Sequence, residues 1–578
     1  MQIKDVERLT KLTQKAIRLY ESKGLISAER SENGYREHST ETVERLHTIR
    51  LLRGAGVSIP DIRLFCDGVL SLRELLNKRK HEIRGESEEI RARYELCERM
   101  LSAYDGTAVT VEEVFDEGET CTADPVVGDM LALGLDIGTT TVSATVIDLL
   151  EGRQIETYNF LNESVIHTAE QYKREQDPAW ILDKSLRLVD SIVSRYPTVK
   201  CIGITGQQHG ILYINKEGKA VSPLYTWQDG RASQTGKNGI SYVDEIKELT
   251  GCPIATGYGF ATHYTLCKTD GVPSDAVTFC SIMDYIAMVL TGRKESLIHP
   301  SIAASFGLYS LAESKFNTEA IAKINLFGLN LPQLAEGEDV LGYYHGIPVA
   351  YPIGDNQADV FGSLRDECES ILVNYGTGSQ INAVTETPEA PEALELRPYM
   401  FGRYIQNGSA LCGGRAYALV ERFFRNYLEA CGIPCTAQYE QMNRIAALAS
   451  EDALGLSVDT RFSGSRSEPD VRGSITGIDD SNFTPRHLIV GTLQGMADEL
   501  YEMFADCLPM HNGILVASGN AVRKNPTFRR ILEKTFDRSL YMLRAEEEAA
   551  FGAALYAAVA CGTVDLATAK SCISYSES

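Results

Sequence analysis

The sequence has no hydrophobic run approaching the ~20 residues that a helix needs to cross a bilayer, although 44% of its 578 residues are hydrophobic. We also expect no secretory leader, because Met1 is followed directly by the charged stretch Gln2-Ile3-Lys4-Asp5. We therefore expect a cytoplasmic protein without membrane contact. The length predicts three or four domains, because it exceeds what one hydrophobic core supports.

The sequence also lacks a Walker-type phosphate loop and does not favour a disulfide framework. The 14 cysteines are scattered through apolar stretches, the usage typical of reduced thiols. The close pair Cys431 and Cys435 has no second pair to complete a zinc site, so we interpret it as structural. No Gly-x-x-x-x-Gly-Lys-Ser/Thr motif occurs in the chain.

Basic residues are scarce beyond the first hundred positions. Residues 1–101 carry a net charge of +3, whereas the remainder carries −26. Not one Lys or Arg lies between Arg99 and Arg153, where acidic residues cluster. We interpret residues 104–129 as an acidic linker and expect only the N-terminal part to approach nucleic acid.

Short amphipathic segments at the N-terminus predict a helix-turn-helix followed by a hairpin. After a helix over 3–9, Thr13 can cap a second helix over 14–23 that Gly24 ends. Asn33-Gly34 between arginines is a strong hairpin signal. A recognition helix with such a wing contacts DNA, although most arginines are simply solvated. The candidate DNA-binding residues are Gln14, Lys15, Arg18, Arg30, Tyr35 and Arg36.

A charged helix is predicted over 71–101, with an apolar stripe at seven-residue intervals. The stripe runs through Val69, Leu76, Ile83, Ile90 and Cys97. Such a repeat requires a helical partner, but charged residues occupy its second seam. We therefore predict a short dimerisation helix within 71–103 and a homodimer.

From Leu131 onward, apolar strands alternate with helical segments, the pattern of an α/β protein. Two strand–turn–strand units within it are alike, 131–144 and 371–383, and suggest a duplicated fold, although coincidence would also explain them. Their turns offer backbone N–H groups and hydroxyls to phosphate. The candidates are Gly138, Thr139, Thr140, Gly376, Thr377 and Gly378. Asp136 would serve Mg²⁺, directly or through water, unless the first unit is a plain hairpin with a surface carboxylate.

Asp355 is the candidate general base. It follows a strand and Gly354 at the predicted start of a helix, where a carboxylate stays ionised and can accept a hydroxyl proton. A simple helix cap explains the local sequence equally well. Asn356 beside it could hydrogen-bond another hydroxyl.

Two polar segments, 203–210 and 224–231, combine a flat apolar face with planar polar groups, as polyhydroxylated ligands require. His209 alone would more often be a structural histidine. The substrate-binding candidates are Gln208, His209, Trp227, Asp229, Arg231, Asp355 and Asn356. Further on, 513–526 predicts a strand, a glycine turn and a helix that opens at Pro526 and could hold the adenosine. A last helix is predicted over 545–560, with its initial glutamates interpreted as structural.

The first hundred residues resemble the MerR family of transcription regulators. The resemblance is carried by Ile17-Arg18-Leu19-Tyr20-Glu21, Gly24-Leu25-Ile26, Asn33-Gly34-Tyr35-Arg36 and the stretch 51–59. The resemblance implies that the chain forms a dimer and binds double-stranded DNA through residues 1–70. A head that only dimerises the chain is the alternative, since its net charge is small.

The segment from about 131 to 562 resembles the FGGY carbohydrate kinases, and within them the sedoheptulokinase pattern. The matching segments are 207–210, 222–231, 255–263, 354–357 and 412–419. The resemblance implies a multidomain chain, in which an all-α winged helix-turn-helix and a dimerisation helix precede an α/β two-lobed, actin-like (ribonuclease-H-like) ATPase fold. Its lobes would span 130–366 and 367–570.

By this resemblance Asp355 is the catalytic base and Asp136 serves the metal. The nucleotide site would also include Gly413, Gly414, Gly519 and Asn525. Departures from the family pattern at Gln208, Ile302 and Ser518 leave the sugar undetermined.

We therefore predict an enzyme that uses ATP and Mg²⁺ to phosphorylate a small ketose or polyol, with a sedoheptulose-like ketose favoured, and a DNA-binding head that regulates transcription. The alternative is a transcription regulator whose kinase-like body senses sugar or nucleotide with little turnover. The intact Asp136, Asp355 and Gly-Thr turns favour the enzyme.

Overall fold

The computed structural model describes residues 1–578 except 11, 28, 31–35, 84–127, 327–328, 449–454, 466–467, 469 and 578. Tyr35, the predicted linker up to 127 and the predicted dimerisation helix beyond Ile83 therefore lie outside the described residues. Of Arg30 and Arg36, only the backbone is described. None of the helices within the described ranges is both long and apolar enough to cross a membrane.

The head is a small helical domain with a two-stranded wing. Its elements are α1 (Ile3–Thr10), α2 (Gln14–Ser22), β1 (Glu29–Arg30), β2 (Arg36–Glu37), α3 (Thr40–Gly54), α4 (Ile59–Cys66) and α5 (Leu72–Ile83). Thr13 caps α2 as predicted, because its hydroxyl accepts from the N–H of Ala16 at 3.2 Å. The helix ends at Ser22 instead of Lys23, and Gly24 follows with a positive φ of 69°. Arg30 pairs with Arg36 across the antiparallel wing.

The N-terminal lobe is built around a six-stranded sheet with the order β16-β17-β8-β3-β4-β5. These strands are β3 (Leu131–Ile137), β4 (Thr141–Asp148), β5 (Arg153–Leu161), β8 (Val199–Gly206), β16 (Val340–Tyr344) and β17 (Ile347–Ala350). Smaller strands are β6 (Val165–Ile166), β7 (Glu175–Gln176), β9 (Leu212–Ile214), β10 (Leu224–Tyr225), β11 (Thr278–Cys280), β12 (Leu297–Ile298), β13 (Tyr309–Ser310), β14 (Lys315–Phe316) and β15 (Gln333–Leu334). The helices of this lobe are α7 (Pro178–Arg195), α8 (Tyr242–Thr250), α9 (Gly259–Lys268), α10 (Ile282–Leu290), α11 (Pro300–Ser305), α12 (Thr318–Lys323) and α13 (Asp355–Ser363).

The C-terminal lobe is built around a seven-stranded sheet with the order β20-β21-β19-β18-β24-β25-β26. Its strands are β18 (Ile371–Tyr375), β19 (Ser379–Thr385), β20 (Glu395–Pro398), β21 (Tyr404–Ala410), β24 (Leu515–Ser518), β25 (Leu540–Leu543) and β26 (Tyr575–Glu577). Its helices are α14 (Gly413–Ala430), α15 (Tyr439–Ala447), α16 (Pro485–Phe504), α17 (Asn520–Arg523), α18 (Pro526–Phe536), α19 (Glu548–Ala560) and α20 (Leu566–Ser571).

The two sheets share one central pattern. In the first, β3 is antiparallel to β4 and parallel to β8, and β4 is antiparallel to β5. In the second, β18 is antiparallel to β19 and parallel to β24, and β19 is antiparallel to β21. The two similar strand–turn–strand units of the sequence therefore occupy equivalent positions in two lobes of related topology.

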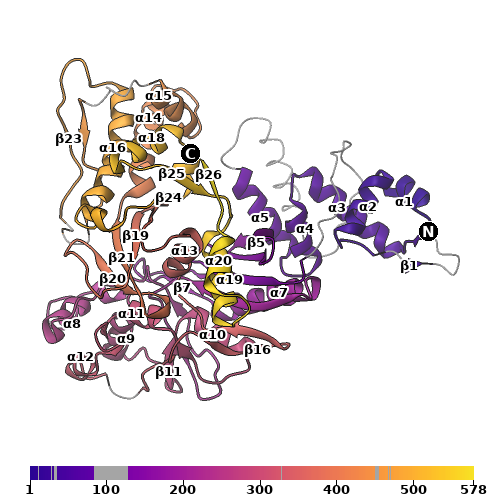
Figure 1. The fold of residues 1–578 in the computed structure, drawn as a ribbon, viewed down its shortest axis with the longest axis horizontal. Helices are drawn as coiled ribbons and strands as arrows, with labels where there is room; N and C mark the ends of the chain where they lie inside the picture. The colour runs from indigo at the N-terminus through magenta and orange to yellow at the C-terminus, as the bar shows by residue number, and fades with distance from the viewer. Residues whose placement is uncertain are drawn as a thin grey trace.

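Helices α13 and α19 lie at the centre of the body, between the two sheets (Figure 1). They cross at paired glycines, since a Cβ on Gly362 would lie 2.7 Å from Cα of Gly552. Helix α19 also presses on the first sheet, where a Cβ on Gly134 would meet the carbonyl of Ala550 at 1.9 Å. Helix α19, predicted over 545–560, begins at Glu548, three residues later than predicted, because Glu547 has a left-handed conformation with φ 55°.

The head packs on one side of the N-terminal lobe (Figure 1). Helices α4 and α5 contact β5, the edge strand of the first sheet. The buried side chain of Arg63 forms an ion pair with Glu156 of β5, and Lys184 of α7 binds Glu74 of α5 at 2.8 Å. The hydrophobic side chains of the head and of this lobe form one continuous core cluster.

Candidate active site

Asp355 begins α13 immediately after β17 and Gly354, as predicted. Its Oδ1 accepts from the backbone N–H of Asn356 at 2.8 Å. The N-cap of α13 is Gly354 and no side chain caps the helix, so Asp355 is its first residue and not the N-cap that the alternative interpretation proposed. Burial raises the pKa of Asp355 to about 6, although that hydrogen bond and the charge of Arg397 lower it. Burial therefore has a larger effect on the pKa of Asp355 than the helix start, from which an ionised carboxylate was predicted, yet the group stays mostly ionised at neutral pH.

Asp136 and Asp355 belong to one cluster of carboxylates between the lobes. Burial raises the pKa of Asp136 well above its ordinary value, and neighbouring negative charges add to the rise. Those neighbours are Asp355, Glu547 and Asp359. Oδ1 of Asp136 is buried and has no hydrogen-bond partner in the described part of the chain. Bringing like charges together without compensation is unfavourable, so the cluster is suited to a cation.

Two of these acids were missed by the sequence analysis. Asp359 lies one turn after Asp355 on α13, and burial with the charge of Glu548 raises its pKa to about 7. Its Oδ2 accepts from Asn374 of β18 at 3.2 Å, which links the two lobes. Glu547 was interpreted as structural, but its charge acts on Asp136. The spacing of Asp355 and Asp359 was the available signal, since residues i and i+4 share a helix face.

The first phosphate-type turn lies between β3 and β4 and is held by the end of β5. Asn162 donates from Nδ2 to the carbonyl of Gly138 at 2.8 Å and from its N–H to the carbonyl of Thr140 at 2.8 Å. Thr140 is exposed, whereas Thr139 is half-buried. The turn is therefore fixed in position with hydroxyls at the surface of the interlobe region.

The second turn lies between β18 and β19 and packs directly against the start of α14. The N–H of Gly414 donates to the carbonyl of Gly376 at 2.9 Å, and a Cβ on Gly413 would lie only 2.4 Å from the backbone of Gly378. The close approach therefore requires glycine at 413. Thr377, at the tip of the turn, is exposed.

Gly519 and Asn525 lie on the connection from β24 to α18. Gly519 has φ 93°, and a Cβ there would lie 2.4 Å from the carbonyl of Tyr375. Asn525 is the N-cap of α18, where its Oδ1 accepts from Phe528 at 3.1 Å. A short helix, α17, lies between them and was not predicted. The structure thus places Gly413, Gly414, Gly519 and the second turn around the end of β18 and gives Asn525 a capping contact as well.

The sugar candidates occupy the ends of β8 and β10. His209 has φ 70°, and its ring stacks on Tyr258 with centroids 4.4 Å apart. Gln208 donates its amide to Gln357 of α13 and so lies close to the helix that begins with Asp355. Asn356 is buried, and its amide donates at 3.1 Å to Asn382 of β19.

Asp229 and Arg231 bind each other. Arg231 donates from Nε to Asp229 at 2.7 Å and forms a second ion pair with Glu175 at 2.7 Å. Its guanidinium lies 4.1 Å from the ring centroid of Tyr225. Both oxygens of the fully buried Asp229 accept hydrogen bonds. The pair that the sequence suggested for sugar hydroxyls therefore also braces the loop that carries Trp227.

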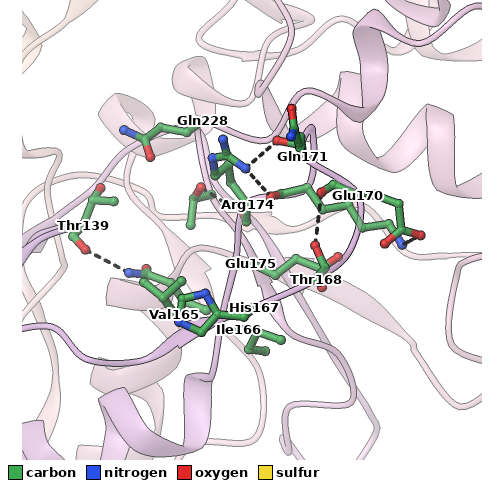
Figure 2. A pocket seen from close by; sticks show the side chains of 13 residues that line it. Thr139, Val165, Ile166, His167, Thr168, Glu170, Gln171, Arg174, Glu175 and Gln228 are labelled. Atoms are coloured by element: carbon green, nitrogen blue, oxygen red, sulfur yellow. Dashed lines mark hydrogen bonds and ion pairs between the residues drawn. The ribbon is translucent and has the colours of Figure 1, made fainter.

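Trp227 is 47% exposed and connects the sugar segment to the first phosphate turn. Its Nε1 donates to Oγ1 of Thr139 at 2.9 Å, and that hydroxyl donates to Gln207 at 3.2 Å. The amide of Gln207 donates to Oε1 of Gln176 at 2.8 Å. The amide of Gln176 donates in turn to the carbonyl of Thr139 at 2.9 Å. A cavity of about 360 Å³ lies beside Thr139, and the β6–β7 region lines it with mostly polar side chains. Figure 2 shows these side chains.

Two lobes of related topology, with phosphate-type turns and a carboxylate cluster between them, define the class of two-lobed, actin-like sugar kinases. Solved structures share the fold: the xylulose kinase from Rhodospirillum rubrum aligns with a TM-score of 0.66 at 21% identity, covering 77% of this chain and 93% of that one. The gluconate kinase from Lactobacillus acidophilus aligns with a TM-score of 0.66 at 18% identity, covering 78% and 93%.

The chain belongs to the FGGY family of carbohydrate kinases. The model of the family's N-terminal domain matches residues 131–372, and that of its C-terminal domain matches 371–561. Residues 1–69 match the MerR HTH family regulatory protein. The chain is 25% identical over 471 residues to the sedoheptulokinase of Mus musculus, covering 74% of this chain and 96% of the relative. It is 23% identical over 469 residues to the xylulose kinase of Haemophilus influenzae, covering 75% and 91%.

The fold class and both family assignments made from the sequence are thereby confirmed. Membership of a kinase family implies the use of ATP. The individual site residues, the metal and the sugar stay predictions.

Proposed function

We propose that this chain phosphorylates a hydroxyl group of a small ketose or polyol at the expense of Mg·ATP, with a sedoheptulose-like ketose favoured. The observation that carries the proposal is Asp355, a half-buried carboxylate with a pKa of about 6 at the start of the central helix α13. Proton acceptors are most effective when their pKa lies near the working pH. The sedoheptulokinase relatives support a ketose as the acceptor.

In this mechanism Asp355 accepts the proton of the attacking hydroxyl. The N–H of Asn356 fixes one of its carboxylate oxygens, and the charge of Arg397 keeps it ionised at neutral pH. Gln208, His209 and Trp227 would orient the sugar. Positioning and electrostatics do most of the work in phosphoryl transfer, so closure of the lobes around these residues would exclude water.

The residues between the lobes fit Mg²⁺. Oδ1 of Asp136 is buried without a partner among the described residues, and the surrounding carboxylates are the hard oxygen ligands that this ion prefers. Within the described ranges no group of three or more His, Cys, Asp or Glu side chains is placed to hold a metal ion, so Mg²⁺ bound here would need waters and phosphate oxygens to complete its shell. When bound, Mg²⁺ neutralises negative charge on the transferring phosphate. Asp136 would hold it, and the turns at Gly138 and Gly376 would hold the phosphates.

A coupled assay of ATP consumption with a panel of ketoses and polyols tests the proposal. Asp355→Asn should abolish turnover while leaving sugar affinity, measured by calorimetry, within about twofold of the wild type. Asp244→Asn is the matched control, since Asp244 is an exposed acid on α8. Turnover of Asp355→Asn at the wild-type rate would remove Asp355 from the mechanism, and a wild-type chain that consumes no ATP with any sugar would refute the kinase proposal.

The MerR-type head supports a second function, sequence-specific binding of double-stranded DNA. Lys15 and Arg18 are exposed on α2, and Gln14 is half-exposed beside them. If the body only sensed ligand, DNA binding would depend on sugar or nucleotide while turnover would be absent. Electrophoretic mobility shifts with and without these ligands, run beside the turnover assay, separate a regulator from an enzyme and from an enzyme that is also a regulator.

A further inference from the structure

The edge strand β5 lies between the head and the interlobe site. On the head side, the ammonium of Lys78 on α5 donates to the backbone carbonyl of Asn159 on β5 and to the carboxylate of Asp61 on α4. The side chain of Lys78 is only 11% exposed. The first part of the predicted dimerisation helix is therefore bonded to the backbone of this strand.

The same residue of β5 faces the active site with its side chain. Asn159 donates from Nδ2 to Oε1 of Glu547 at 2.7 Å. Three residues further, directly after the end of β5, Asn162 donates to the carbonyls of Gly138 and Thr140 in the first phosphate turn. One strand thus connects α5 with both the carboxylate cluster and the phosphate turn.

Glu547 is in a conformation that a side chain seldom adopts. Its φ of 55° lies in the left-handed region, which disfavours residues other than glycine, and contacts of the surrounding structure must hold it there. The hydrogen bond from Asn159 is such a contact. Glu547 is also close enough to Asp136 for its charge to act on that carboxylate.

We propose that Asn159 is a positioning residue for the metal–nucleotide site, and that the docked head, through Lys78, helps to set the position of Asn159. In this arrangement the helix-turn-helix domain is part of the support of the kinase site. The proposal rests on the proposed function, because it assigns Asn159 and Glu547 to the support of the ion beside Asp136. Since binding free energies couple reciprocally, Mg·ADP should also stabilise the docked position of α5.

Calorimetric titration of the full chain with ADP, at saturating Mg²⁺ and in EDTA, tests the proposal without turnover. Asn159→Ala should weaken Mg²⁺-dependent ADP binding about tenfold, the usual effect of removing a residue that orients a metal-binding group. Lys78→Met, which keeps the length of the side chain, should weaken it about threefold. In EDTA all variants should bind ADP alike, because the effect acts through the cation.

Asn77→Ala is the matched control on the same helix, since the amide of Asn77 donates to Glu163 of the body at 3.4 Å, and it should leave Mg·ADP affinity unchanged. Hydrogen exchange in residues 72–83 should slow when Mg·ADP is added to the wild type and should slow less in Asn159→Ala. If the wild type binds Mg·ADP and both Asn159→Ala and Lys78→Met bind it equally well, the inference is overturned and the proposed function still stands. A wild type that binds no Mg·ADP would overturn both.

Discussion

Arg397 allows the role of Asp355 to be tested through the pH dependence of the reaction. Arg397 lies on β20 of the C-terminal lobe, is almost fully buried, and forms an ion pair with Glu395 at 2.6 Å. Its Nη1 donates to Asn356 at 3.3 Å. The positive charge lowers the pKa of Asp355, which burial raises to about 6. Removing that charge must therefore raise the pKa further.

The size of the effect follows from the structure. A neighbouring opposite charge shifts a carboxyl pKa by about 1 to 3 units, and the low end applies here because Glu395 already neutralises part of Arg397. With a pKa of about 6, Asp355 is about 90% ionised at pH 7 and about half ionised at pH 6. A shift of about one unit in Arg397→Met would lower kcat/KM about fivefold at pH 6 and about twofold at pH 7, and would leave it unchanged above about pH 8.5.

The assay is the pH profile of kcat/KM from pH 5 to 9, with folding checked by circular dichroism at each pH. Arg397→Lys keeps the charge and should keep the acid limb where the wild type has it. If Arg397→Met loses activity equally at all pH values, the arginine acts by packing. If its acid limb coincides with that of the wild type, Asp355 is not the group whose ionisation limits the reaction.

Three further perturbations have defined outcomes. Gly413→Ala should reduce the free energy of unfolding, measured by urea titration, by about 1–3 kcal/mol, because the new Cβ would collide with the backbone of Gly378. The control is Gly54→Ala, which has open space around its Cβ and should change the free energy of unfolding by less than about 1 kcal/mol. Glu156→Gln leaves the buried Arg63 without its counter-charge and should destabilise head docking by about 3–5 kcal/mol, seen as faster proteolytic release of the head. Burial raises the pKa of Glu156, but the charge of Arg63 and the hydrogen bonds from neighbouring tyrosines outweigh it, so the pKa is lowered. The stabilisation by Glu156 is therefore present at neutral pH and should be lost as the pH falls below the usual glutamate range. Arg18→Ala should weaken binding to operator DNA and reduce the salt dependence by about one phosphate contact, whereas unchanged binding would mean that α2 does not lie on DNA.

Local sequence patterns determined the elements that the structure confirms. Thr13 and Gly24 mark the ends of α2 to within one residue, because a capping hydroxyl and a left-handed glycine are local requirements. The two strand–turn–strand units were visible because apolar strands followed by Gly-Thr recur in the same order. Asp355 at the start of α13 was visible for the same reason.

The composition of the interlobe site depended on contacts between distant segments. Asp359 and Glu547 join the carboxylate cluster only because α13 and α19, nearly 200 residues apart, cross at small residues in the middle of the body. No local pattern distinguishes Glu547 from the glutamates that commonly begin a helix. Likewise, the sequence offered Asp229 and Arg231 as substrate-binding candidates, and only the folded structure showed that Arg231 binds Asp229 and Glu175.

The sequence by itself thus determined the order of the domains, the phosphate-type turns and the candidate base, since each depends on a few neighbouring residues whose conformational preferences act locally. The tertiary structure decided the docking of the head on β5, the pairing of lobes around α13 and α19, and the raised pKa values of the buried acids. Those properties arise from burial and from charges brought together across long separations in the chain, and neither is encoded in any short stretch of residues.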